Sequence, residues 1–152
     1  MGESGDGFVR LPDGSARWGR FGAAGLLIGH RSGDGAMSYF LARRAPETHL
    51  GGTWAIPGGA LDEDETPLEG AVREFGEEIG VSLPAFRVVG TYEDDNGSWS
   101  YFTLVLEVEE RFDPPPVLGW EIADARWVPA ADLGDLDLFG PFREALARLS
   151  LI

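Results

Sequence analysis

The chain has 152 residues, enough for one domain with a sizeable core but too few for two comfortable ones. It contains no cysteine, which excludes a disulfide scaffold, a thiolate zinc site and a thiol nucleophile. The formal net charge of −14, from 12 basic and 26 acidic residues, argues against a large nucleic-acid-binding surface, whereas a small polyphosphate could bind through bridging metal ions.

Residues 1–19 are rich in Gly, Ser and Asp and show little periodicity. We therefore expect a flexible N-terminal segment, either a mobile tail or an irregular edge, ahead of a single domain over residues 20–152. The first residues lack the basic and apolar regions of a secretory signal, and no apolar run approaches membrane-spanning length. A cytoplasmic protein without a membrane partner is the default expectation.

Two strands and a loop are predicted next. Residues 20–30 have the apolar and small side chains of a buried central strand, and residues 37–43 predict its hairpin partner. The following loop contains Arg43, Arg44 and His49, which are candidates for substrate contact because loops that enter a site commonly make such contacts. Ordinary surface positions are the alternative for all three.

One helix with clear ends is predicted after this loop. Thr66 can act as the N-cap with Glu69 three residues later, Pro67 suits the first helical position, and Gly80 is a natural stop. The apolar residues at helical spacing predict one buried face. They are Leu68, Ala71, Val72, Phe75 and Ile79.

Three carboxylates, Glu74, Glu77 and Glu78, crowd one side of this helix beside the apolar stripe. They lie near the helix C-terminus, where negative charge is unfavourable, and Glu74 and Glu78 form a like-charge i,i+4 pair. Arg73 alone cannot neutralise them. A hard divalent cation such as Mg²⁺, with Mn²⁺ as a plausible substitute, would offset the repulsion. The alternative is a solvated acidic face with surface ion pairs.

The remainder of the chain predicts three more strands and a closing amphipathic helix. Asn96-Gly97 is the strongest hairpin signal, and the nearby Asp94 and Asp95 are candidates for further metal ligands or for turn hydrogen bonds. The expected elements are strands over residues 86–94, 99–109 and 122–129 and a helix over residues 141–149. This order of strands, helix, strands and helix indicates an α+β fold or an α-β-α sandwich.

The helix and its approach resemble the Nudix box at every defined position. The matching pattern is Gly59-x5-Glu65-x7-Arg73-Glu74-Phe75-x-Glu77-Glu78-x-Gly80-Val81. The resemblance extends over residues 54–59 and 121–128, and Phe75 is its one mild departure, since an aliphatic residue is more usual there. It implies an α+β Nudix fold, an α-β-α sandwich with a mixed β-sheet.

The resemblance also implies a metal-dependent hydrolase that cleaves a phosphoanhydride in a nucleoside diphosphate linked to another group. Glu74, Glu77 and Glu78 would be metal ligands, together with the backbone carbonyl of Gly58. Arg73 would orient the glutamates by pairing with Glu65, while Gly59, Glu65 and Gly80 would have structural roles. The general base would be a box glutamate or an acid from elsewhere, with Glu121 ahead of Asp94 among the outside candidates.

Several alternatives stay open from the sequence. The favoured substrate is a nucleoside triphosphate, including an oxidised one, cleaved to the monophosphate and pyrophosphate, and ADP-ribose or a nucleotide sugar is the alternative. A non-catalytic nucleotide-sensing or protein-interaction domain is a third reading, although the box keeps every acid. Prenyl diphosphate isomerisation needs a catalytic cysteine that this chain lacks. The chain could form a homodimer, as many relatives do. No spacing rule decides which aromatic or basic side chains face a pocket among Trp18, Arg43, His49, Trp99 and Tyr101. Trp54 could stack on a base, although packing in the core is the favoured reading.

Overall fold

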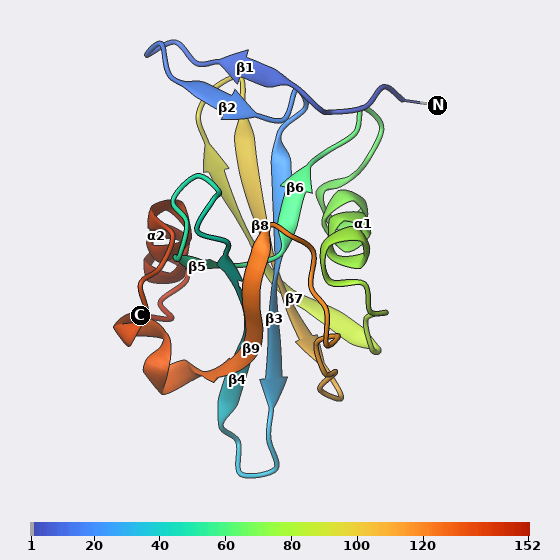
Figure 1. Ribbon diagram of the computed structural model, residues 1–152, viewed down its shortest axis with the longest axis vertical. Coiled ribbons are helices and arrows are strands. Elements are labelled where there is room, and N and C mark those ends of the chain that lie inside the picture. Colours follow the sequence, from blue (N-terminus) through green and yellow to red (C-terminus); the bar gives the residue numbers. More distant parts are fainter. Residues whose placement is uncertain (1) are drawn as a thin grey trace.

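A seven-stranded mixed sheet forms the centre of the computed structural model, which describes residues 2–152 (Figure 1). The strands are β3 (Ala23–Arg31), β4 (Met37–Arg44), β5 (Trp54–Ala55), β6 (Gly58–Ala60), β7 (Phe86–Asp95), β8 (Ser100–Val108) and β9 (Ile122–Pro129). Strand β3 pairs with β8 in parallel and with β4 and β6 in antiparallel orientation. Its residues from Ala23 to Gly29 are all buried, as expected for a central strand.

Helices cover both faces of this sheet. Helix α1 (Pro67–Ile79) packs Phe75 and Ile79 against Leu26 and Ile28 of β3. Helix α2 (Gly140–Arg148) follows a 3₁₀ turn, η1 (Ala130–Asp135), and packs its apolar side chains with Leu27 on the opposite face. Alternate residues of β3 thus serve two cores, as the two-residue period of a strand requires. The two helices lie on opposite sides of the sheet (Figure 1). The predicted α-β-α sandwich with a mixed sheet is confirmed.

The ends of α1 follow the predicted chemistry. The Thr66 hydroxyl accepts a hydrogen bond from the Glu69 N–H at 3.1 Å, and the Glu69 carboxylate accepts one from the Thr66 N–H at 2.9 Å. Gly80 ends the helix with φ of 78°, in the left-handed region that glycine enters without a steric penalty. Both helix boundaries were therefore predictable from local sequence.

Both predicted hairpins are present, but one turn lies later than expected. Asp95 pairs with Ser100, and the Asn96 N–H donates to the Trp99 carbonyl oxygen at 2.8 Å. Gly97 and Ser98 therefore occupy the turn, so the prediction of Asn96 and Gly97 as the turn pair is wrong by one residue. The Asp95 carboxylate accepts the Gly97 N–H at 2.8 Å, which assigns this acid to the turn.

The N-terminal segment contains structure that the sequence did not predict. Strands β1 (Phe8–Arg10) and β2 (Ala16–Trp18) form a separate two-stranded antiparallel sheet. Leu11, in the connecting turn, is buried against Ala23 and Trp99. The expectation of an irregular segment is wrong for these two strands, because three residues are too few to show a periodic pattern in the sequence. Flexibility of residues 1–19 stays a prediction. Met1 lies outside the described residues.

The membrane expectation concerns the helices. Within residues 2–152, none of the helices combines the length and apolar character needed to cross a bilayer.

Candidate active site

Arg73 forms hydrogen bonds both to residues that precede α1 and to residues within it. Its Nε and Nη2 donate to the two carboxylate oxygens of Glu65 at 2.7 and 2.8 Å, the bidentate geometry that suits a guanidinium. Nη2 also donates to the Ala60 carbonyl oxygen at 2.9 Å, and Nη1 donates to Glu74 at 3.1 Å and to Glu77 at 3.3 Å. One side chain therefore ties the loop after β6 to the acidic face of the helix, and the predicted pairing of Arg73 with Glu65 is present.

This pair has a clear electrostatic signature. The hydrogen bonds from Arg73 hold the pKa of Glu65 below its ordinary value, and Glu65 in turn raises the pKa of Arg73. The Glu65 carboxylate also accepts the Asp62 N–H at 2.7 Å, which fixes the loop that enters the helix. Both side chains are largely shielded from solvent, with exposed fractions of 30% for Arg73 and 19% for Glu65.

The box glutamates experience different surroundings. Burial raises the pKa of Glu78 to about 8, and the nearby charges of Glu74 and Glu121 add to the effect. Burial also raises the pKa of Glu74, against the opposing hydrogen bond from Arg73. Glu77 is exposed and makes only long contacts to Arg73. The site therefore contains partly buried carboxylates whose charges repel one another, and a bound cation would relieve this repulsion.

Gly58 and Gly59 of β6 bring the backbone close to these acids. The Gly58 N–H donates to the Glu78 carboxylate at 3.0 Å. A Cβ atom added at Gly59 would lie 2.5 Å from the carboxyl carbon of Glu74, whereas one at Gly58 would lie 2.4 Å from the Ala24 carbonyl oxygen. Glycine is therefore required at both positions, at Gly59 by a side chain of the site and at Gly58 by the backbone of β3.

We expect Gly59→Ala to lower kcat by about 10–100-fold, the usual effect of disturbing the support of a metal site, with a small loss of stability because the Glu74 side chain can rotate away. Gly58→Ala should destabilise the fold by about 1–3 kcal/mol, since it meets backbone that cannot move aside. Gly76→Ala on α1, where an added Cβ meets nothing within 4 Å, is the matched control and should be neutral or slightly stabilising. Steady-state kinetics and thermal melts of the three variants separate these effects; wild-type kcat in Gly59→Ala would contradict the supporting role.

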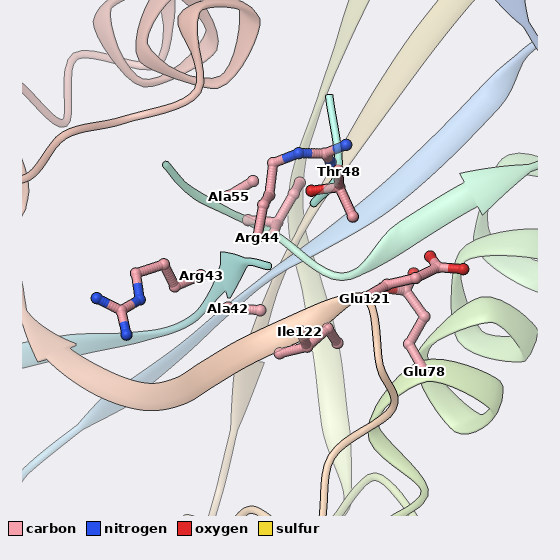
Figure 2. Close-up of a pocket in the computed structure, with 9 residues that line it drawn as sticks. Ala42, Arg43, Arg44, Thr48, Ala55, Glu78, Glu121 and Ile122 are labelled. Carbon is pink, nitrogen blue, oxygen red and sulfur yellow. The ribbon is translucent and has the colours of Figure 1, made fainter. Parts of the chain in front are cut away.

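A cleft opens beside Glu78 at the end of β4 (Figure 2). It is lined by Ala42, Arg43, Arg44, Thr48, Ala55, Ile56, Glu78, Glu121 and Ile122. Glu121 comes from the turn before β9, and its carbonyl oxygen accepts the Ala45 N–H at 2.8 Å. This contact places Glu121 beside Glu78, two acids that are far apart in sequence. The outside candidate for the general base therefore lies at the site.

The two predicted substrate arginines line the cleft, and the predicted histidine does not. The Arg44 Nε donates to the His49 carbonyl oxygen at 2.8 Å, and its guanidinium lies 5.0 Å from the Phe139 ring. Arg43 points away from the two glutamates, with its guanidinium 5.8 Å from the ring of Trp54 (Figure 2). The His49 side chain is exposed outside the cleft, so only its backbone supports the site. Substrate contact by His49 stays a prediction without support from the cleft.

The other candidate residues lie outside the cleft. Trp54 and Trp99 are buried in the cores, and Trp18 lies on β2. Asp94 pairs with Tyr101 across β7 and β8 and does not line the cleft. The Tyr101 hydroxyl lies beneath Gly58, 3.0 Å from where a Cβ would be, and burial raises the pKa of this phenol. Its place under the site could not be read from strand periodicity.

The donor chemistry of this site fits a hard divalent cation. Glu74, Glu77 and Glu78 offer carboxylate oxygens, and the mutual repulsion of the partly buried acids would be relieved by positive charge. Across the described range 2–152, however, no three acidic, histidine or cysteine side chains already converge as a metal site. The long contacts between Arg73 and Glu77 leave that side chain free to rotate toward its neighbours.

With this geometry in place, comparison with known proteins decides the family. A family model described as the NUDIX domain matches residues 20–149. The chain belongs to the Nudix family. A provisionally named 8-oxo-dGTP diphosphatase 3 of Mycobacterium tuberculosis is 41% identical over 151 residues, covering 95% of this chain and 69% of that protein. The 8-oxo-dGTP diphosphatase of Escherichia coli K12 is 31% identical, covering 72% of this chain and 84% of that protein.

Solved structures agree with this assignment. The crystal structure of RenU, a Nudix hydrolase from M. smegmatis, has a TM-score of 0.85 and 38% identity, covering 96% of this chain and 93% of that one. The similarity to Nudix proteins therefore extends beyond the Nudix box to nearly the whole chain. This protein is a Nudix pyrophosphohydrolase that acts on nucleotides.

Proposed function

We propose that this Nudix enzyme hydrolyses a nucleoside triphosphate, including an oxidised purine triphosphate, to the monophosphate and pyrophosphate. The observation that carries the proposal is the cleft beside the acidic helix, which is lined by Glu78, Glu121, Arg43 and Arg44. Arginine binds phosphate oxygens well, and the carboxylates provide for a cation and for proton transfer. Two relatives that cover most of this chain are named as 8-oxo-dGTP diphosphatases, which favours triphosphates.

We assign the cofactor as Mg²⁺, with Mn²⁺ as a substitute, held by Glu74, Glu77, Glu78 and the carbonyl oxygen of Gly58. Such an ion, when bound, neutralises the pyrophosphate and lowers the pKa of water. Gly58 is suitably placed because its own N–H already binds Glu78.

The remaining chemistry belongs to the side chains of the site. Arg73, itself fixed by its pair with Glu65, holds Glu74 in place and makes only long contacts to Glu77. A box glutamate or Glu121 accepts the proton from the attacking water, which adds to phosphorus as the bond to the bridging oxygen breaks and pyrophosphate leaves. Arg44 and Arg43 bind phosphate oxygens or the base from the other side of the cleft.

Two other readings remain as outcomes of the test. ADP-ribose or a nucleotide sugar would be cleaved by the same groups, so substrate selection depends on side chains outside the box. A nucleotide-sensing domain without catalysis would retain binding alone. A cytoplasmic location and a homodimer stay predictions.

The test is a substrate panel with Mg²⁺, with Mn²⁺ in parallel. It comprises the common nucleoside triphosphates, oxidised purine triphosphates, ADP-ribose and nucleotide sugars, with release of pyrophosphate or monophosphate measured. We expect the highest kcat/KM with a triphosphate, dependence on added divalent metal, and loss of turnover in Glu121→Gln if this residue is the base. A higher kcat/KM for ADP-ribose would reject the triphosphate assignment, and nucleotide binding without any turnover would reject catalysis.

A further inference from the structure

Trp120 is an exposed aromatic side chain that the fold does not explain. Its exposed fraction is 75%, compared with 6% for Trp54 and 8% for Trp99. The indole makes no aromatic or cation-π contact with any of the described residues. Keeping so large an apolar side chain in water forgoes the gain from burial, so a ligand is a natural partner.

Trp120 lies on the turn that carries the cleft residue Glu121. The Gly119 carbonyl oxygen accepts the Ile122 N–H at 3.1 Å, which makes Trp120 and Glu121 the two central residues of this turn. Glu121 and Ile122 both line the cleft. On the other side, a Cβ at Gly119 would lie 4.0 Å from the Glu78 carbonyl oxygen. The turn therefore lies between α1 and the end of β4, next to the acids of the site.

Among the described residues, those that line the cleft include no aromatic side chain on which the nucleobase of a nucleotide could stack. The arginines and a cation would bind the phosphates, while the acids that line the cleft offer no flat apolar surface to a base. An indole can supply that surface, because every base has a π-face and stacking tolerates differences in base identity.

We propose that Trp120 stacks on the nucleobase of the substrate at the edge of the cleft, and so is a binding residue that favours nucleotides over phosphates without a base. This inference rests on the proposed nucleotide hydrolysis. It also gives Trp120 a function that the sequence alone did not suggest.

The test measures Kd for an α,β-methylene nucleoside triphosphate by calorimetry, so that binding is read without turnover. Trp120→Ala should weaken binding by about 5- to 150-fold, the range for losing one base-aromatic stack, whereas Trp120→Phe should stay within a few-fold of wild type. The Ki of inorganic triphosphate, which has no base, should be unchanged in both variants. Trp18→Ala, which removes the exposed Trp of β2, is the matched control and should bind like wild type.

Each outcome bears on a separate claim. Equal Kd values for Trp120→Ala and wild type would overturn stacking while leaving hydrolysis intact, as would an equal loss of affinity for inorganic triphosphate. If wild type binds the analogue but hydrolyses no nucleotide, the proposed function fails and the Kd comparison still decides the role of Trp120. A wild type that binds no nucleotide would overturn both.

Discussion

Glu77→Gln should lower kcat by roughly 10²–10⁴-fold, the range for losing a positioned proton-transfer group, and should leave the fold intact. Glu77 is a box acid, and its role as ligand or base requires the negative charge that glutamine lacks. Its side chain is 60% exposed and contacts Arg73 at no less than 3.3 Å, so little stability depends on it. Steady-state kinetics with saturating Mg²⁺ and a thermal melt would measure both quantities.

The chain offers a closely matched control for this variant. Glu144 on α2 is also 60% exposed and also lies four residues from an arginine, Arg148, at 4.0 Å. Glu144→Gln removes the same charge from a helix that contributes no residue to the lining of the cleft, and kcat should not change. If Glu77→Gln kept more than about a tenth of wild-type kcat, a drop smaller than positioned groups usually give, the assignment of Glu77 to the chemistry would be wrong.

Arg73→Met should destabilise the protein by about 2–4 kcal/mol, somewhat less than for a fully buried ion pair, and should also lower kcat about 10–100-fold. The substitution leaves Glu65 without its bidentate partner and removes the hydrogen bond that positions Glu74. Chemical denaturation gives the stability change. The double variant Glu65→Gln/Arg73→Met should lose less than the sum of the two single variants, because the residues act as a unit.

The pH dependence of this loss has a definite sign. Arg73 lowers the pKa of Glu65 from an ordinary value of 4.5, so the pair stabilises the native state fully above that pH and the contribution fades as pH falls through the lowered value. The difference between Arg73→Met and wild type should therefore shrink in acid. Arg87, whose side chain is 72% exposed, pairs with Glu107, which also has Arg31 as a partner, so Arg87→Met should cost below about 1 kcal/mol. A comparable cost for the two arginines would contradict the bracing role of Arg73.

Local sequence determined helix α1 and its acids. Thr66, Glu69 and Gly80 act on backbone groups within a few residues, so the helix ends follow from short-range hydrogen bonds and glycine's backbone freedom. The spacing of the three glutamates places them on one side of any helix with this register. The resemblance supplied the pairing of Arg73 with Glu65, which the structure contains.

Only the tertiary structure decided how the rest of the site assembles. Glu121 reaches Glu78 because its turn is hydrogen-bonded to Ala45 at the end of β4, a contact between segments with no sequence pattern in common. Parallel pairing of β3 with β8 likewise depends on long-range packing that periodicity does not encode. The position of His49 outside the cleft and the exposure of Trp120 could not be predicted either. The periodicity of a helix or strand predicts which of its side chains face the core, but His49 and Trp120 lie in loops. The orientation of a loop is set by the elements that it contacts in the folded protein.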